Sequence, residues 1–171
     1  MQIDEQGRHE PPHFGAPVEV VAGFHRFLRE TLIWKCEGLS EEQLRWSPVP
    51  SGTCLLGILK HSVEVERWWI NRAIGNHPDL PMLWGTDDPD ADWRVESDDT
   101  FTAIRARFEV EAMQTEALLA KVGWDDATYD GRPHNADLSV GWILSHMVEE
   151  VARHCGQADI IREMIDGQTG E

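Results

Sequence analysis

The stretch HMVEEVARHCGQAD, residues 146–159, breaks the pattern of an otherwise regular amphipathic helix. Alternating steps of four and three residues stay on one face of a helix, the face that normally packs against a core. From residue 143 onward this face reads Ile143, Met147, Glu150, His154, Gln157, Ile161 and Met164. The face is apolar at both ends and polar in its middle. A carboxylate and an imidazole therefore occupy positions expected to be buried.

Four segments with helical periodicity predict an all-α protein built as a four-helix bundle. Pro17 suits a first helical turn, Gly167 suits a helix end, and Ser51 or Thr53 is expected to cap the second helix. No segment has the strict alternation typical of a half-buried strand. The expected helices cover residues 17–37, 54–75, 98–122 and 139–166.

The connections between these helices are rich in proline, glycine and aspartate. The middle one, residues 76–97, is long enough for a crossover between the second and third helices rather than a tight hairpin. Its acidic run DDPDAD is expected to be a solvated loop. We expect one bundle domain over residues 17–167, a flexible N-terminal arm over 1–16 and a short tail over 168–171.

Composition limits the classes of function. The chain of 171 residues carries 31 Asp and Glu against 15 Lys and Arg, a formal net charge of −16. Such a surface repels phosphate backbones and anionic headgroups, so neither nucleic acid nor membrane is an expected partner. No run approaches the roughly 18 to 20 apolar residues of a membrane span, and the N-terminus lacks a signal-peptide pattern. A cytoplasmic location is expected.

The three cysteines are too few and too widely spaced for a disulfide framework or a cysteine-rich zinc site. Cys155 follows His154 directly, which raises the possibility of a catalytic thiol. The favoured interpretation is a small buried hydrophobe.

Helix geometry restricts how the polar residues of the last helix can act together. Residues four apart are neighbours, so Glu150 can pair with His154 or with His146. The two histidines are eight residues apart, about 12 Å along the helix axis, and cannot share one ion. A site therefore uses one of these pairs, and Glu150 belongs to either.

The second helix offers a third ligand. Its apolar face reads Ile58, His61, Val65 and Trp68, again with a histidine in the middle. In helical bundles, metal sites are built from side chains on facing helices. Two imidazoles and one carboxylate suit zinc, nickel or non-haem iron and leave coordination positions open. The alternative is a buried Glu–His ion pair without metal.

Two motifs point to a known family. The stretches PSGTCLLGILKHSVEVERWW (50–69) and WILSHMVEEVARHCGQADIIREMIDGQTG (142–170) resemble the DinB-like superfamily. More narrowly, they are similar to an actinobacterial branch related to the metal-binding domain of mycothiol-dependent maleylpyruvate isomerases. The resemblance implies an up-down-down-up bundle with the long crossover between its second and third helices. It also implies a divalent metal held by His61, Glu150 and His154.

Members of the superfamily with assigned roles are mostly transferases and isomerases that use a low-molecular-weight thiol. The resemblance thus implies a metal-dependent thiol S-transferase that joins mycothiol, or a similar thiol, to a small electrophile. Zinc is the first expected metal, with nickel or iron as alternatives. Trp68, Arg67 and Arg153 flank the expected ligands and are predicted to contact substrate or thiol. Dimers are common in the superfamily, so the resemblance makes a homodimer possible without fixing the oligomeric state.

The rival hypothesis is a non-catalytic bundle. In it, a structural metal or a metal-free polar cluster supports stress-related binding or dimerisation. A structural zinc site usually has four protein ligands, and only three are visible here, which favours an open catalytic site. His146 is either a partner of Glu150 or an alternative ligand.

Most of the remaining tryptophans and histidines need no functional role to explain them. Trp34, Trp46 and Trp124 are expected to be packing residues, whereas the other tryptophans include candidates for an aromatic wall around a ligand. The histidines outside the two motifs are expected to lie on the surface: His9, His13, His25, His77 and His134.

Overall fold

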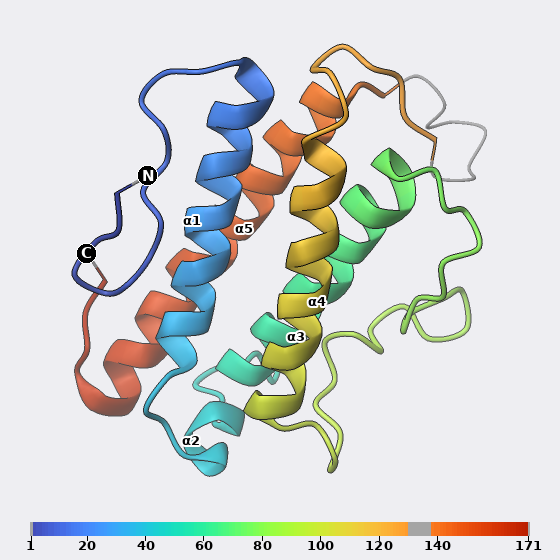
Figure 1. Ribbon diagram of the computed structural model, residues 1–171. Helices are drawn as coiled ribbons and strands as arrows, with labels where there is room; N and C mark the ends of the chain where they lie inside the picture. The colour runs from blue at the N-terminus through green and yellow to red at the C-terminus, as the bar shows by residue number, and fades with distance from the viewer. Residues whose placement is uncertain (1, 130–137, 171) are drawn as a thin grey trace.

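The computed structural model describes residues 2–129 and 138–170 and is built from helices throughout that part of the chain (Figure 1). The all-α prediction is confirmed for these residues, where the only β pairing is two isolated bridges. The elements are α1 (Pro17–Cys36), α2 (Glu41–Arg45), α3 (Leu55–Glu66), the π-helix η1 (Arg67–Ile74), α4 (Phe101–Leu119) and α5 (Val140–Asp166).

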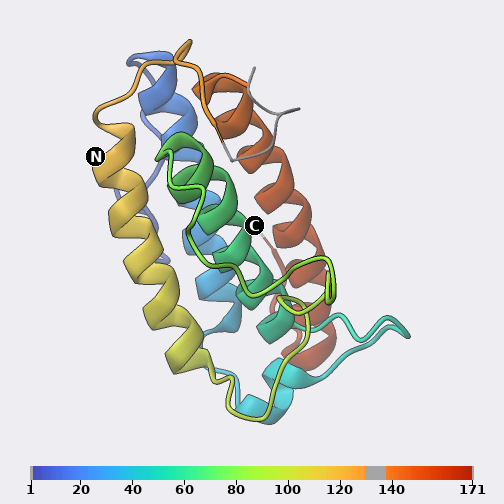
Figure 2. The ribbon, with the colours of Figure 1, turned by 90° about the vertical axis from the view of Figure 1, so that its right-hand side faces the viewer.

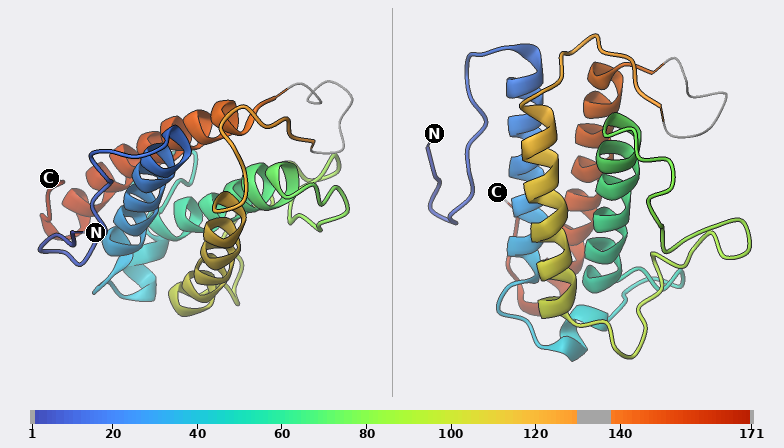
Figure 3. Two further views of the ribbon diagram at one scale, coloured as in Figure 1. Left: turned by 45° about the horizontal axis from the view of Figure 1, so that its top comes forward. Right: turned by 45° about the vertical axis from the view of Figure 1, so that its right-hand side comes forward.

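The long helices lie side by side, with α1 against α5 and α3 against both α4 and α5 (Figures 1 and 3). α1 and α5 run in one direction, and α3 with η1 and α4 run in the other. The chain after η1 returns along the outer side of α3 before it enters α4 (Figure 2). We call this connection, residues 75–100, the crossover. The DinB-like bundle topology as such stays a prediction.

The helix ends follow local chemistry. Pro17 opens α1, Ser139 caps α5 by accepting a hydrogen bond from the Trp142 backbone N–H, and Gly167 closes α5 with a φ of 82°. The predicted cap of α3 is wrong, because Cys54 is its N-cap and makes no side-chain cap bond. The hydroxyls of Ser51 and Thr53 instead lie 3.0 Å from each other.

The continuation of α3 is a π-helix, which periodicity did not predict. The backbone N–H of Gly75 donates to the carbonyl oxygen of Ile70 at 3.0 Å, five residues back rather than four. π-helical turns are rare and occur frequently at functional sites. This one carries Trp68 and Trp69.

The core forms where apolar faces of the four long helices meet. No helix in the described part of the chain has the length and apolar character needed to cross a membrane. The largest fully buried apolar side chains are Leu32, Leu44, Leu55, Leu56, Ile58, Leu59, Ile70, Ile104, Phe108, Ile143 and Leu144.

The surface prediction for His25 is wrong. His25 is only 1% exposed and lies on the side of α1 that faces α3 and α4. Burial lowers the pKa of its imidazole to about 4. Beside His25 lies the carboxylate of Glu66. This carboxylate accepts hydrogen bonds from Arg29 at 2.9 Å and from Thr115 at 2.7 Å. His13 and His77 are exposed as predicted, and His134 lies outside the described residues.

The N-terminal arm contacts α1 along its length. The Arg8 guanidinium donates to Thr31 at 2.9 Å and lies over the Phe27 ring, 4.4 Å from its centroid. One residue later, the His9 imidazole lies 2.7 Å from the carboxylate of Glu30.

Candidate metal centre

Three side chains from two helices converge beside the core. His61 lies on α3, and Glu150 and His154 lie one turn apart on α5; one ligand atom from each lies within 4.8 Å of the others. Oε1 of Glu150 is 3.3 Å from Nε2 of His154 and 3.6 Å from Nε2 of His61. The structure therefore brings together the three residues expected from the sequence.

Both imidazoles are held by acceptors on their far side. Nδ1 of His61 lies 2.7 Å from Oδ2 of Asp92, and Nδ1 of His154 lies 2.9 Å from Oε1 of Gln157. A carboxylate and an amide oxygen accept hydrogen bonds, so each ring donates from Nδ1, and a neutral ring then carries its lone pair on Nε2, the nitrogen nearer Glu150. This is the support that metal-ligating histidines almost always have.

The donor set fits a divalent cation. Two Nε2 lone pairs and a carboxylate all accept hydrogen bonds, so the three groups repel one another unless a cation or additional protons lie between them. His154 is only 7% exposed, so little water reaches its side of the cluster. Burying these acceptors without a cation or a shared proton would therefore cost more free energy than it would at the surface. Two imidazoles and one carboxylate match a zinc site with a position left for another ligand.

The crossover supplies one of these supports and a covering ring. Trp93 stacks on His61 with a centroid distance of 3.9 Å and an interplanar angle of 17°. Asp92 belongs to the acidic run expected to be solvated, and for this residue that expectation is wrong, since it is 3% exposed. Its carboxylate faces inward to His61.

Two contacts on α3 fix the crossover in this place. A Cβ at Gly57 would come within 2.9 Å of the Trp93 carbonyl oxygen, so the backbone passes there only because the residue is glycine. One turn on, the buried Lys60 ammonium donates to the Arg94 carbonyl and to the Asp99 carboxylate, both at 2.7 Å. The segment containing Asp92 is thereby held against the turn that carries His61.

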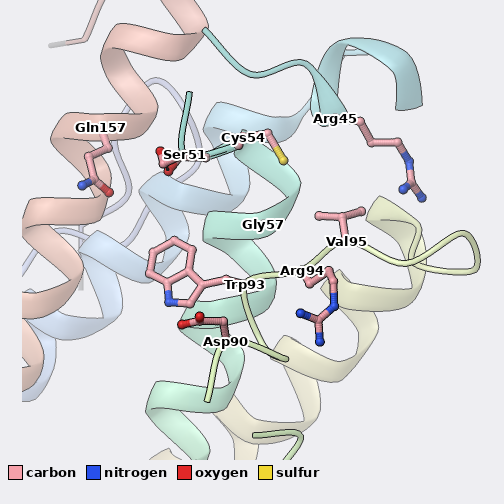
Figure 4. A pocket seen from close by; sticks show the side chains of 11 residues that line it. Arg45, Ser51, Cys54, Gly57, Asp90, Trp93, Arg94, Val95 and Gln157 are labelled. Atoms are coloured by element: carbon pink, nitrogen blue, oxygen red, sulfur yellow. Dashed lines mark hydrogen bonds between the residues drawn. The ribbon is translucent and has the colours of Figure 1, made fainter. Parts of the chain in front are cut away.

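Two cavities border the cluster. The smaller, about 280 Å³, is aromatic and contains one of the candidate ligands in its wall; its lining is His61, Val65, Trp68, Trp69, Trp84, Pro89, Asp92 and Trp93. The larger, about 800 Å³, contains no candidate ligand; its wall includes Trp93, which stacks on His61, and Gln157, which bonds His154 (Figure 4). Its lining is mostly polar: Arg45, Ser51, Gly52, Thr53, Cys54, Gly57, Asp90, Trp93, Arg94, Val95 and Gln157.

The comparison with known families agrees with this geometry. The sequence profile described as mycothiol-S-transferase matches residues 20–167, most of the chain. The chain belongs to the mycothiol-S-transferase family. The suspected DinB-like relationship is thereby confirmed. A search of curated proteins gave no match.

Within this mycothiol-S-transferase family member, the predicted contact residues lie in three different surroundings. Trp68 lines the aromatic cavity and packs on Trp84 at a centroid distance of 4.8 Å. Arg67 donates to the Glu111 carboxylate and, at 2.9 Å, to the Pro81 carbonyl. Arg153 is exposed on α5, one residue before His154, with no ion pair in the described part of the chain.

His146 lies apart from the three candidate ligands. Its ring stacks on Trp142 at a centroid distance of 5.3 Å and meets Trp69 edge-on at 5.0 Å. Its Nδ1 is 3.6 Å from the Glu149 carboxylate. Glu150, which His146 was expected to contact as a partner, is not among these neighbours.

The cysteines of this mycothiol-S-transferase family member are buried free thiols. Burial raises the pKa of Cys155 and that of Cys36 to about 12 each. A thiol with so high a pKa is protonated at neutral pH and is a poor nucleophile. The interpretation of Cys155 as a packing residue is supported.

Sequence reasoning missed Asp92 and gave Gln157 no role, and it counted Trp93 only among the tryptophans of a possible aromatic wall. Gln157 was on the polar face of the last helix, three residues after His154, and this spacing is a usable signal for a side-chain partner. The crossover has no helical or strand periodicity, so its sequence does not indicate which side chains point toward the core. A tryptophan beside an acid, within a long connection of a compact domain, is the available signal there.

Proposed function

We propose that this protein is a metal-dependent S-transferase that joins mycothiol to a small electrophilic molecule. The observation that carries the proposal is the opposed pair of Nδ1 bonds from His61 to Asp92 and from His154 to Gln157. These bonds leave the lone pair of each neutral ring on Nε2, the nitrogen nearer Glu150. Membership of the mycothiol-S-transferase family supports the choice of thiol.

The three ligands are His61, Glu150 and His154, and zinc is the metal that suits them best, with nickel or iron as alternatives. A bound divalent cation lowers the pKa of a thiol that reaches it, and the thiolate is the nucleophile. In the overall substitution, R–SH and R′–X give R–S–R′ and HX. The leaving group departs with its bonding electron pair and takes up the thiol proton.

The chain's own residues hold this arrangement. Asp92 and Gln157 fix the orientation of both rings, and Trp93 covers His61 and keeps water from that face. Trp68 offers an apolar wall to the substrate. Substrate or thiol contacts by Arg67 and Arg153, a homodimer and a cytoplasmic location stay predictions.

Metal analysis with a matched control tests the ligand set. Wild-type protein, His154→Ala and His146→Ala would each be loaded with zinc, dialysed and measured for metal content. His146 lies on the same helix as His154 but outside the cluster, so its variant should retain about one zinc per chain, as the wild type does, while His154→Ala should lose it. Equal retention by both variants would remove His154 from the site.

Turnover tests the reaction. The zinc-loaded protein, incubated with mycothiol and an aromatic halide, should form the thioether faster than the same mixture without protein. His61→Ala should return the rate to background. No thioether above background across several electrophiles would contradict transferase function even if zinc binds.

A metal-free polar cluster is the second candidate, because the 3.3 Å and 3.6 Å separations from Glu150 also permit protonated imidazoles to pair with it. The protein would then be a non-catalytic member of its family. Wild-type protein that retains no metal after zinc loading, yet is destabilised by Glu150→Gln, would favour this candidate.

A further inference from the structure

The π-helix η1 brings two arginines to the same side of the molecule. Arg67 and Arg72 are five residues apart, which on an α-helix would place them about 140° apart around the axis. In a π-helix, a backbone N–H bonds to the carbonyl oxygen five residues back, so residues five apart lie nearly one above the other. The His77 N–H bonds to the Arg72 carbonyl oxygen at 2.9 Å in this register. Both guanidinium groups can therefore reach one neighbouring segment.

That segment is residues 80–84 of the crossover, which we call the strap. Arg72 donates to the Leu80 carbonyl oxygen at 3.0 Å, and Arg67 donates to the Pro81 carbonyl oxygen at 2.9 Å. The strap lies outside every helix, so its backbone has no regular hydrogen-bond partners. The two arginines supply partners for consecutive carbonyl groups instead.

A third charged side chain binds the strap from α3. The carboxylate of Glu64, which is 1% exposed, accepts a hydrogen bond from the Leu83 backbone N–H at 3.0 Å. Its other oxygen accepts from Arg107 of α4, so the carboxylate is held from two sides. Hydrogen bonds to an ionised acceptor are stronger than those between neutral groups. The strap is thus bound at three of its five residues by charged side chains.

The two arginines are themselves held in place. Arg67 also donates to the buried carboxylate of Glu111 on α4, and Asn71 donates to the same carboxylate at 2.6 Å. The Arg72 guanidinium lies over the Trp68 ring, 4.5 Å from its centroid. A side chain that already has a second contact loses less conformational entropy when it binds the strap.

The last residue of the strap is a wall of the aromatic cavity. Trp84 packs on Trp68 with a centroid distance of 4.8 Å and lines the cavity of about 280 Å³ together with the candidate ligand His61. Trp68 therefore contacts both the Arg72 guanidinium and the strap. A displaced strap would remove this wall of the cavity.

We propose that the three charged side chains are positioning residues, which hold the strap so that Trp84 closes the aromatic cavity beside His61. The π-helix allows two of them to act on consecutive carbonyl groups. This inference rests on the proposed function in so far as the cavity belongs to the metal centre. None of the three residues needs to touch metal, thiol or electrophile, and Arg67 acts through the strap rather than as the predicted ligand contact.

Fluorine NMR of protein labelled with 5-fluorotryptophan tests the position of Trp84. Its signal is the one that disappears in Trp84→Phe. Arg67→Met and Arg72→Met should each shift this signal toward its position in the unfolded protein, because the Trp84 ring leaves Trp68 for solvent. Arg105→Met is the matched control: it removes exposed ion pairs far from the strap in sequence and should leave the signal unchanged.

Amide hydrogen exchange tests Glu64. Glu64→Ala should accelerate exchange of the Leu83 N–H by about 10- to 100-fold, the effect of losing a hydrogen bond to a charged group. Glu64→Gln keeps an acceptor oxygen and should retain most of the protection. The Trp142 N–H, which Ser139 caps at the start of α5, is the internal control and should exchange at the wild-type rate in both variants.

Two results would overturn the positioning role. One is an unchanged Trp84 signal in both arginine variants, and the other is a Leu83 N–H whose exchange does not respond to Glu64→Ala. Circular dichroism shows whether each variant keeps its helices. If Arg67→Met loses them through its contact with Glu111, Arg72→Met, which leaves that contact intact, decides the outcome.

Both measurements use the full chain without added metal or substrate, which separates this inference from the proposed function. The expected shifts in a protein that forms no thioether would keep the positioning role and remove the transferase function. Turnover by the wild type, with an unchanged Trp84 signal in both arginine variants, would keep the function and overturn the positioning role.

Discussion

The imidazole of His61 donates a hydrogen bond from Nδ1 to the buried carboxylate of Asp92, 31 residues further along the chain, over 2.7 Å. The bond joins a regular helix to an irregular crossover. It fixes which nitrogen of His61 faces Glu150. The properties of a candidate ligand are thus set by a segment without secondary structure.

Removal of this support should weaken metal binding without removing a ligand. Asp92→Ala should lower zinc affinity by about 10- to 100-fold, the usual effect of losing such a partner. Competition with a chromophoric chelator measures the affinity. Asp87→Ala, an exposed acid of the same run, is the control and should match the wild type. Equal affinities for all three proteins would mean that Asp92 does not act on His61.

The close passage of the crossover over Gly57 predicts a steric effect. Gly57→Ala places a Cβ 2.9 Å from the Trp93 carbonyl oxygen and should destabilise the fold by about 1–3 kcal/mol as the crossover shifts. Zinc affinity should fall with it, because Asp92 and Trp93 move together. Denaturant unfolding and chelator competition measure the two effects.

Gly156→Ala is the matched control for this substitution. Gly156 lies in α5, and a Cβ there meets nothing within 4 Å. The change should therefore stabilise the protein by up to about 1 kcal/mol through helix propensity alone. If Gly57→Ala behaved in the same way, the crossover would not be held by this contact.

The buried thiols predict resistance to alkylation. With a pKa of about 12, Cys155 and Cys36 should react slowly with iodoacetamide in the native protein at neutral pH and rapidly after unfolding in urea. Mass spectrometry of the digested protein gives the modified fraction at each position. Cys155→Ala should retain both zinc and thioether formation, and loss of turnover with zinc retained would indicate a catalytic thiol instead.

His25 predicts a pH dependence of stability. Burial first, and the nearby Arg29 charge to a lesser degree, lower the pKa of this imidazole from 6.5 to about 4, against the opposing effect of Glu66. Between these values the unfolded chain binds a proton that the folded chain does not. The free energy of unfolding should therefore fall by roughly 3 kcal/mol from this group as the pH decreases from about 6.5 to about 4.

Urea unfolding at about pH 7 and about pH 5 isolates this contribution when wild type and His25→Leu are compared. The variant should lose less stability between the two conditions, since it has no imidazole to protonate in the unfolded chain. His77→Leu, at an exposed position, should keep the wild-type difference. An unchanged difference in His25→Leu would mean that His25 is already charged in the folded protein.

Helical spacing marked the candidate ligands but left His146 open as an alternative; the resemblance to the DinB-like superfamily selected the set, and neither indicated the supports. His61, Glu150 and His154 interrupt apolar faces whose period can be counted, and the same period predicted the long helices. Asp92 and Trp93 lie where no period exists, and their inward direction depends on Gly57 and Lys60 of another element. Such tertiary contacts have no local signature.

Two local features show different limits. The short helix α2 was not predicted, because residues 38–53 were expected to be a connection. It has a capping box in which Ser40 and Gln43 bond each other's backbone, and this spacing was an available signal that was not used. The π-helix was not readable, because over the eight residues 67–74 its side-chain pattern resembles that of an α-helix. Arg67 was predicted to contact a ligand from sequence proximity, and its side chain is directed to Glu111 on α4.

The crossover also determines the order in which the candidate centre assembles during folding. Glu150, His154 and Gln157 become neighbours as soon as α5 is helical, whereas His61 meets Asp92 only after a loop of 31 residues has closed. An ion that needs ligands from both α3 and α5 binds only the folded protein. Its binding therefore shifts the folding equilibrium toward the folded state by mass action. On our proposal, bound metal therefore adds to the stability of the folded protein as well as supplying its chemistry.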